Sequence, residues 1–341
     1  MRPLEEYGQI LLAVKMLCSV VFLVLISITI GATKNIVCYY DSRAANYVSA
    51  TFPKNISPTS CTHYVYDGVG VTAQGDIRIL SNYDTASGFD EFQNIRRTKN
   101  VKLYVLLSSD RDGGKNLTNS TLARFVNRLR SRLYMINKQL SVSVSAQFAD
   151  AYDITSLSLY ADMINLHAYN FTTNTANTVA NLAPLFSSTP FNAVSVNSTV
   201  TSWLAAGARR NKVNLVVATF GRTYVLASED QRAVGARSTG PGEAGFNTKR
   251  PGLIARYEFC NIAGEYNSAS DSVTATTYYF KGKSWIGIET EDTLVQKFTY
   301  VLDSSLGGVA IFTLDLDDTT NTCGNGAYRV SDLAYQYFAS E

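Results

Sequence analysis

Short apolar runs alternate with longer segments of mixed polarity along most of this chain. Seven apolar runs are expected to form strands, at 36–40, 63–71, 101–107, 140–146, 163–169, 213–220 and 308–314. Four other segments have the spacing of helices, at 89–99, 121–138, 194–210 and 290–302. Buried strands separated by helices are typical of a parallel sheet, so the pattern predicts a β/α architecture.

The segment between the third and fourth predicted strands indicates a single helix. Its apolar residues keep helical spacing without a break, at Leu122, Phe125, Val126, Leu129, Leu133 and Ile136. One helix provides only one crossover between strands. The chain therefore offers seven strands where a closed TIM-type barrel has eight. We expect an α/β fold built on an incomplete barrel of this type.

One connection is too long for a single crossover. Between 220 and 308 the chain contains a Gly- and Pro-rich stretch at 239–252 and a strand-like stretch at 274–288. We interpret 223–288 as a small α+β insertion, which leaves 33–222 and 289–341 for the barrel.

The N-terminal segment has the features of a targeting signal. An uncharged run of 17 residues extends from Met16 to Ala32, with Lys15 before it and Gly31 near its end. These features favour a secretory signal peptide over 1–32 that is cleaved after Ala32. A signal anchor that remains in the membrane is the alternative, because the run reaches the lower limit for spanning a bilayer. The expected location is extracellular.

Cysteines and glycosylation motifs agree with export. Outside the apolar run the chain has Cys38, Cys61, Cys260 and Cys323, an even number that suits two disulfides. Glycans are expected at Asn55, Asn116, Asn119 and Asn197, each of which begins a sequon. Asn170 also begins one, but its expected place at the barrel rim would protect it from modification.

The overall composition excludes several classes of function. Thirty Lys and Arg balance 28 Asp and Glu, so the net charge of +2 gives no electrostatic reason to expect a nucleic-acid partner. Two His and five Cys, without CxxC or HExxH spacing, make a zinc site improbable. We expect a monomer without metal or cofactor, and membrane association only if the N-terminal segment remains as an anchor.

Six motifs occur in an order that resembles glycoside hydrolase family 18, the chitinases and chitinase-like lectins. They are NIVCYYDSRAANY, CTHYVYDGVG, DITSLSLYADMINLHAYNF, NLVVATFGRTYVLAS, GPGEAGFNTKRPGLIARYEFC and LGGVAIFTLDLDD. The resemblance covers nearly all of 34–338. It implies that Cys38 pairs with Cys61 and Cys260 with Cys323, and that 223–288 is the family's chitinase insertion domain.

The resemblance fails at the motif that carries the family's catalysis. Enzymes of this family have DGxDxDxE on the fourth barrel strand. The final Glu protonates the glycosidic oxygen, and the Asp before it orients the N-acetyl group of the substrate. This chain contains no DxxDxDxE, and its helix occupies the stretch from Phe125 to Leu140 where the motif should lie. The missing strand and the missing acid are one deletion, so we assign no catalytic residue.

The implied sugar-binding positions are partly retained. Tyr39, Tyr169 and Arg222 match the family pattern, whereas Asn170 replaces a carboxylate and Phe312 replaces a tryptophan on which a sugar stacks. The aromatic residues that the family places after the first two strands are also absent, since Arg43 and Gly68 occupy their positions. The resemblance therefore implies a chitin-binding groove with fewer stacking surfaces.

Three hypotheses follow. The first is a secreted, catalytically inactive chitinase-like protein that binds chitin or other N-acetylglucosamine-containing glycans. The second is a residual hydrolase that uses another carboxylate at the barrel rim. The rim candidates, which we interpret mainly as turn and cap residues, are Asp110, Asp112, Asp150, Asp153 and Asp315. The third is a splice-truncated or mis-assembled product of a gene whose full-length form hydrolyses β-1,4-linked N-acetylglucosamine.

Overall fold

The computed structural model describes residues 34–56, 60–71, 77–98, 100–108, 119–171, 177–187 and 194–339. The expected export segment, Asp110, Asp112 and Asn116 lie outside the described residues. Residues 35–341 form one compact unit, to which the following description applies.

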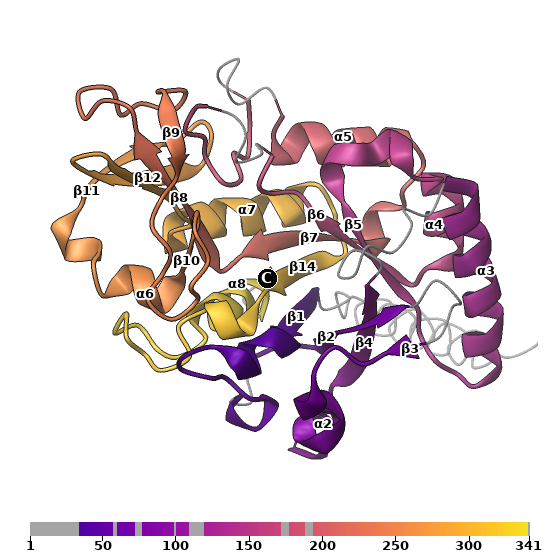
Figure 1. The fold of residues 1–341 in the computed structure, drawn as a ribbon. Helices are drawn as coiled ribbons and strands as arrows, with labels where there is room; N and C mark the ends of the chain where they lie inside the picture. The colour runs from indigo at the N-terminus through magenta and orange to yellow at the C-terminus, as the bar shows by residue number, and fades with distance from the viewer. Residues whose placement is uncertain are drawn as a thin grey trace, which may run out of the picture. The chain divides into compact units, whose positions relative to one another are not determined.

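All seven predicted strands are present in one parallel sheet (Figure 1). They are β1 (Asn35–Asp41), β2 (His63–Val71), β4 (Lys102–Ser108), β5 (Ser141–Ser145), β6 (Met163–His167), β7 (Val213–Ala218) and β14 (Gly308–Phe312). The short strand β3 (Ile77–Arg78) extends the sheet by antiparallel pairing with β2. The order of the parallel strands is β4-β2-β1-β14-β7-β6-β5, as expected for consecutive units of a TIM-type barrel.

The sheet is open between β4 and β5. Each of these strands pairs with one parallel neighbour, and no pairing between the two occurs among the described residues. They are linked through α3 (Asn119–Met135), which confirms the single helix predicted at 121–138. Val105 and Leu107 alternate with the inward-facing Tyr104 and Leu106 and are 50% and 39% exposed, so the outer face of β4 is only partly covered beside the opening. The Tyr104 hydroxyl of β4 donates to Gln139 Oε1, just before β5, at 2.7 Å.

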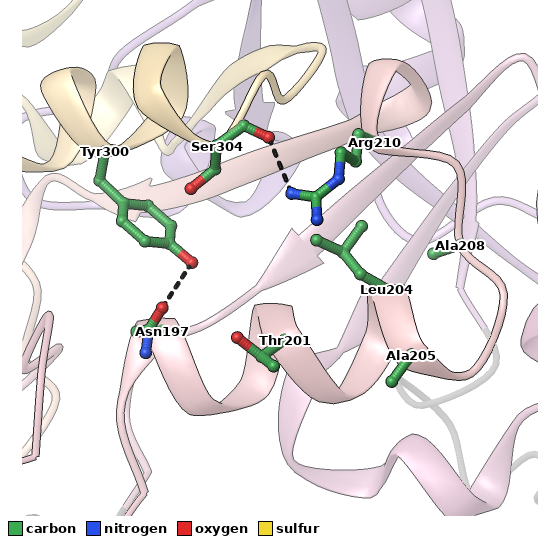
Figure 2. A pocket seen from close by; sticks show the side chains of 8 residues that line it. All are labelled: Asn197, Thr201, Leu204, Ala205, Ala208, Arg210, Tyr300 and Ser304. Atoms are coloured by element: carbon green, nitrogen blue, oxygen red, sulfur yellow. Dashed lines mark hydrogen bonds between the residues drawn. The ribbon is translucent and has the colours of Figure 1, made fainter.

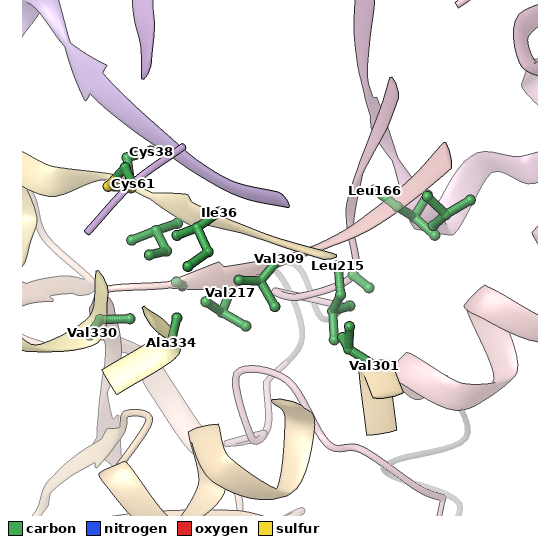
Figure 3. Packing of buried hydrophobic residues seen from close by; sticks show 14 of the residues in the cluster. Ile36, Cys38, Cys61, Leu166, Leu215, Val217, Val301, Val309, Val330 and Ala334 are labelled. Carbon is green, nitrogen blue, oxygen red and sulfur yellow. A yellow bond between two sulfur atoms is a disulfide. The ribbon is translucent and has the colours of Figure 1, made fainter. Parts of the chain in front are cut away.

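Helices cover the outer face of the parallel sheet. The α-helices besides α3 are α2 (Phe89–Thr98), α4 (Ile154–Tyr160), α5 (Val196–Ala205), α6 (Arg256–Cys260), α7 (Glu291–Asp303) and α8 (Arg329–Ala339). The short helical turns are η1 (Ser42–Asn46), η2 (Pro53–Asn55), η3 (Asp84–Gly88), η5 (Ala146–Ala151), η7 (Arg210–Lys212), η8 (Ala263–Glu265) and η9 (Leu314–Leu316). Figure 3 shows Leu215 and Val309 of the sheet packed towards Val301 of α7. None of the described helices combines the length and apolar character needed to cross a bilayer.

The helix predictions were correct in place and less accurate in length. The predicted helix at 194–210 is shorter in the structure, because Ser195 caps α5 and the helix ends at Ala205. Neither α4 nor α8 was predicted. The predicted strand at 213–220 is divided in the structure, since β7 ends at Ala218 and Phe220 begins a strand of a second sheet.

The second sheet is small and antiparallel. It contains β8 (Phe220–Leu226), β9 (Ser238–Pro241), β10 (Leu253–Ala255), β11 (Asn267–Asp271), β12 (Thr276–Lys281) and β13 (Ser284–Gly287). The central order is β10-β8-β13-β12-β11, with β9 paired to β8. Trp285 is fully buried on this sheet and stacks on Tyr278, with 5.1 Å between the ring centroids.

Both disulfides have the pairing that the resemblance implied. Cys38 on β1 bonds Cys61 just before β2, and Cys260 at the end of α6 bonds Cys323 near the C-terminus. The second bond closes 63 residues of sequence and ties the small sheet to the final segment of the barrel. Constraining a loop of this length in the unfolded chain is expected to stabilise the fold.

A buried ion pair joins α7 to the small sheet. Lys297 Nζ lies 3.0 Å from Glu289 Oε2 and donates to the Ala275 carbonyl at 3.0 Å. Thr293 Oγ1 also donates to Glu289 Oε2, and the Lys297 side chain is 1% exposed. Removing one partner of such a pair leaves an uncompensated charge in the interior.

We therefore predict that Lys297→Met destabilises the protein by about 3 to 5 kcal/mol. Lys281 provides a matched control, because its ion pair with Glu265 is exposed and Lys281→Met should change stability little. Urea unfolding at neutral pH measures both variants. Equal stability of Lys297→Met and the wild type would contradict the buried-pair interpretation.

Candidate functional site

Five rings meet on the inner side of the parallel sheet, towards the carboxyl ends of its strands. They belong to Tyr39 on β1, His167 on β6, Tyr169 just after β6, Phe220 on β8 and Phe312 on β14. Phe312 is the centre of this ring cluster, with centroids 5.4 Å from Tyr39, 5.1 Å from His167 and 6.3 Å from Tyr169. Tyr169 meets Phe220 edge to face at 5.9 Å. The predicted residues Tyr39, Tyr169 and Phe312 thus lie together.

A chain of hydrogen bonds fixes the polar atoms of the ring cluster. Asn165 Nδ2 donates to the Tyr39 hydroxyl at 2.6 Å, and that hydroxyl donates to Ser143 Oγ at 3.3 Å. Ser143 Oγ lies 2.6 Å from His167 Nε2, and His167 Nδ1 lies 2.8 Å from the Tyr169 hydroxyl. The orientation of the two tyrosines is therefore set by side chains on β5 and β6.

Ser143 and Asn165 were not identified from the sequence as site residues. The alternation of serine and valine along β5 could have identified Ser143, since Ser141, Ser143 and Ser145 share one face of the strand. Small hydroxyls on the inner face of an edge strand suggest a polar interior at that point. The sequence could not show that Tyr39 and His167 would reach this row.

Burial keeps the groups of the ring cluster uncharged near neutral pH. Desolvation lowers the pKa of His167 to about 4 and raises the pKa of Tyr39 to about 12. The pKa of Tyr169 is raised well above 10, again because its hydroxyl is removed from water. The cluster therefore offers neutral hydrogen bonds and aromatic faces, which suit an uncharged sugar.

Arg222 and Asn170 lie close in sequence to Phe220 and Tyr169 of the ring cluster, and the structure gives them different surroundings. Arg222 lies on β8, where it pairs in register with Leu253 and Gly287, and its buried Nε has no hydrogen-bond partner among the described residues. Asn170 has a φ of 54°, and its backbone N–H donates to the Leu182 carbonyl at 2.6 Å. Both positions are partly buried. No described contact joins Arg222 to the rings.

Arg43 and Gly68, where the resemblance implied the loss of aromatic residues, are both constrained by local contacts. Arg43 turns back to form an ion pair with Asp41, and its backbone N–H donates to Asp41 Oδ1 at 2.9 Å. At Gly68 an added Cβ would lie 2.4 Å from the Leu106 carbonyl oxygen, so no larger residue fits without movement of β4. Neither position therefore supplies a stacking surface.

Carboxylates near the strand ends are tied into the protein. Asp315 is completely buried and accepts from the Asp41 backbone N–H at 3.0 Å. Burial, and then the nearby charge of Asp41, raise the pKa of Asp315 to about 7. Asp153 caps α4 by accepting from the Ser156 N–H at 3.0 Å, and Asp150 is exposed in η5. Within the described ranges, no group of three or more His, Cys, Asp or Glu is placed to hold a metal ion.

The described sequons differ in their surroundings. Asn55 is exposed at the end of η2. Asn197 lies in a cavity of about 450 Å³ between α5 and α7, where its Oδ1 accepts from the Tyr300 hydroxyl at 3.1 Å (Figure 2). Asn119 is the first residue of α3. The cavity lies outside the barrel and is separate from the ring cluster, because α5 and α7 follow the outer face of the sheet.

Comparison with known proteins agrees with this architecture. The porcine (Sus scrofa) oviduct-specific glycoprotein is 25% identical over 371 aligned positions, which cover 89% of this chain and 69% of the relative. The Ostrinia furnacalis Group IV chitinase in complex with allosamidin matches with a TM-score of 0.84 at 22% identity. The match covers 90% of this chain and 99% of the chitinase chain. Human YKL-39, a pseudo-chitinase with retained chitooligosaccharide binding properties, matches with a TM-score of 0.82 at 20% identity. The match covers 90% of this chain and 100% of the YKL-39 chain.

The family model for glycosyl hydrolases family 18 matches residues 112–317. This range contains β5, β6, β7 and the whole small sheet, and it ends just after β14. It covers more than half of the chain, and the parallel strand order is that of the TIM-type fold. The chain therefore belongs to glycosyl hydrolases family 18.

Proposed function

We propose that this protein is secreted and binds chitin or other N-acetylglucosamine-containing glycans without hydrolysing them. The observation that carries this proposal is the ring cluster around Phe312, which offers aromatic faces and hydrogen bonds but no accessible acid among the described residues. The relatives support it at the level of the family, since YKL-39 is described as a pseudo-chitinase that retains chitooligosaccharide binding.

The loss of catalysis is proposed from the sequence. No DGxDxDxE segment occurs between β4 and β5, and the described residues show no pairing between those two strands. Asp315 is a poor substitute for the missing Glu, because it is completely buried and already accepts a backbone hydrogen bond. A general acid must come within hydrogen-bond distance of the glycosidic oxygen. We therefore favour an inactive member of the family, or pseudoenzyme, over a residual hydrolase.

The remaining parts of the proposal concern secretion, domain organisation and the origin of the deletion. The two disulfides are consistent with an oxidising compartment. We retain the proposals of a signal peptide over 1–32, a chitinase insertion domain over 223–288, and glycans at the four sequons. A splice product remains the alternative origin of the deletion, and the genomic sequence around the junction would identify an intact exon if one exists.

Binding at the ring cluster should depend on Phe312. Replacing this ring in Phe312→Ala removes a stacking surface, so we expect chitohexaose binding to weaken about three- to tenfold. Titration calorimetry measures the affinity, with Tyr335→Ala on the exposed face of α8 as a control that should bind normally. Undiminished binding by Phe312→Ala would place the sugar elsewhere.

Purified protein should not release the fluorophore from a fluorogenic chitobioside. Losing the general acid alone commonly reduces the rate by about 10²- to 10⁴-fold, and the family mechanism also needs the missing Asp. Steady turnover that disappears in Tyr169→Phe would overturn the proposal, since that tyrosine lies in the ring cluster and a contaminating enzyme would not respond to it.

The ring cluster should lose stability in acid. The folded-state pKa of His167 is about 4, below its ordinary value of 6.5, so the unfolded chain binds a proton more readily. Stability from this group is fully present above about pH 6.5 and is lost as the pH falls towards 4. Urea unfolding from pH 7.5 to 4.5 should therefore show a smaller decrease in His167→Gln than in the wild type.

His63 is the matched control for this experiment. Its pKa is also lowered to about 4 by burial, but it lies at the first residue of β2, where its Nδ1 contacts Thr62 Oγ1. His63→Gln should reduce the acid dependence of stability without changing chitohexaose affinity at pH 7. An unchanged acid dependence in both variants would show that neither His is buried in its neutral form.

A further inference from the structure

Positive charge is concentrated in one part of the chain. Residues 96–138 contain eleven Lys and Arg against two Asp, although the whole chain has 30 against 28. The rest of the protein is consequently net acidic. The C-terminal part of this basic segment contains α3, which carries four arginines and no Asp or Glu and is seen at the right of Figure 1.

Three of the four arginines of α3 face away from the protein. Arg124, Arg128 and Arg132 are exposed and follow one another at four-residue spacing, which places them along one side of the helix. Within the described part of the chain, none of the three has an ion pair. Arg130, by contrast, is partly buried and pairs with Asp162 at 2.6 Å. The structure therefore neutralises one arginine and leaves three available to an anionic partner.

Large apolar side chains are exposed among these arginines. Phe125 is 46% exposed and Met135 is 79% exposed. Phe125 lies two helical turns before Arg132, and Met135 lies two turns after Arg128, so each shares the outward face with an arginine. The two apolar side chains are about 15 Å apart along the axis. Tyr134 and Ile136 are also exposed, which makes three consecutive apolar residues at the end of the helix.

We propose that the outward face of α3, defined by Arg124, Phe125, Arg128, Arg132 and Met135, docks on the surface of an anionic phospholipid bilayer. In this arrangement the arginines contact lipid phosphate and carboxylate groups, and Phe125 and Met135 enter the boundary between headgroups and acyl chains. Basic residues combined with exposed apolar residues on one helix are the features of an interfacial membrane site.

Two other occupants fit these features less well. A second copy of the chain, docked through the same face, would bring two sets of unpaired arginines together, and like charges would oppose that contact. A linear polyanion such as a sulfated polysaccharide satisfies the arginines but gives no role to Phe125 and Met135. The bilayer accounts for both the charge and the exposed apolar surface.

Vesicle co-sedimentation tests the proposal with the full chain. The wild type should bind phosphatidylcholine vesicles that contain phosphatidylserine and should bind pure phosphatidylcholine vesicles much more weakly. Removing three charges in R124Q/R128Q/R132Q should weaken binding to the anionic vesicles roughly 100-fold. Because the apolar segment 16–32 would itself bind lipid if retained, only proteins with the same N-terminus are compared.

Two further variants separate the proposal from its alternatives. R209Q/R237Q/R250Q removes the same charge from exposed positions elsewhere and should bind anionic vesicles nearly as well as the wild type. F125S/M135S keeps every charge and should still bind weaker than the wild type, by tenfold or more. Circular dichroism verifies that each variant is folded.

The outcomes that would overturn the proposal are distinct. Equal binding to neutral and anionic vesicles would exclude recognition of lipid charge. Full binding by F125S/M135S would exclude insertion. Retention on dextran sulfate beads without binding to any vesicle, lost in R124Q/R128Q/R132Q, would identify the face as a polysaccharide site. Association of the wild type alone in solution, abolished in F125S/M135S, would identify a second copy.

Discussion

The pairing of the first strand with the last is the constraint on which the rest of the structure depends. β1 and β14 lie side by side in register from Asn35–Gly308 to Cys38–Ile311, which joins the first and the last described strands at the centre of the parallel sheet. Gly308 permits this contact, because an added Cβ would lie 2.1 Å from the Asn35 carbonyl oxygen. The same pairing brings Tyr39 and Phe312 together, so the ring cluster is a direct product of it. β4 and β5 are the two ends of the parallel strand order, so the opening lies between the strands farthest from this central pair.

The interior next to the opening has a different chemistry from that of a glycosidase. A glycosidase needs acids whose protonation can change during the reaction. Here Ser143, Asn165 and His167 hold the tyrosines through neutral hydrogen bonds, and burial keeps the imidazole uncharged above about pH 4. Such a network orients ring faces and hydroxyls without moving protons. Binding without cleavage follows from this chemistry more naturally than slow hydrolysis.

The sequence predicted the architecture well because the signals were local and strong. Seven strands, the continuous helix at 121–138 and the four cysteines outside the apolar run could be identified from spacing and residue type, and the structure contains all of them. The site was less predictable. Tyr39, Tyr169 and Phe312 were identified by resemblance, but the row of serines on β5 became meaningful only when Ser143 was found next to His167. The sequence likewise could not show that Asp315 is buried and accepts a hydrogen bond from the Asp41 backbone N–H.

The exposed arginines of α3 illustrate the same limit in another way. Total composition gave a charge near zero, which concealed a basic segment balanced by acids elsewhere. Only the contacts showed that Arg130 is neutralised by Asp162 while its three neighbours face outward. Helical spacing could place these side chains on a face, but it could not show which face packs against the protein.

The central claim is that the protein binds chitooligosaccharide and leaves it intact. Isothermal titration of the purified protein with chitohexaose, followed by mass spectrometry of the recovered sugar after prolonged incubation, tests both parts in one experiment. We predict saturable binding and recovery of chitohexaose alone. Recovery of shorter oligosaccharides, or the absence of any binding heat with a folded protein, would contradict the account.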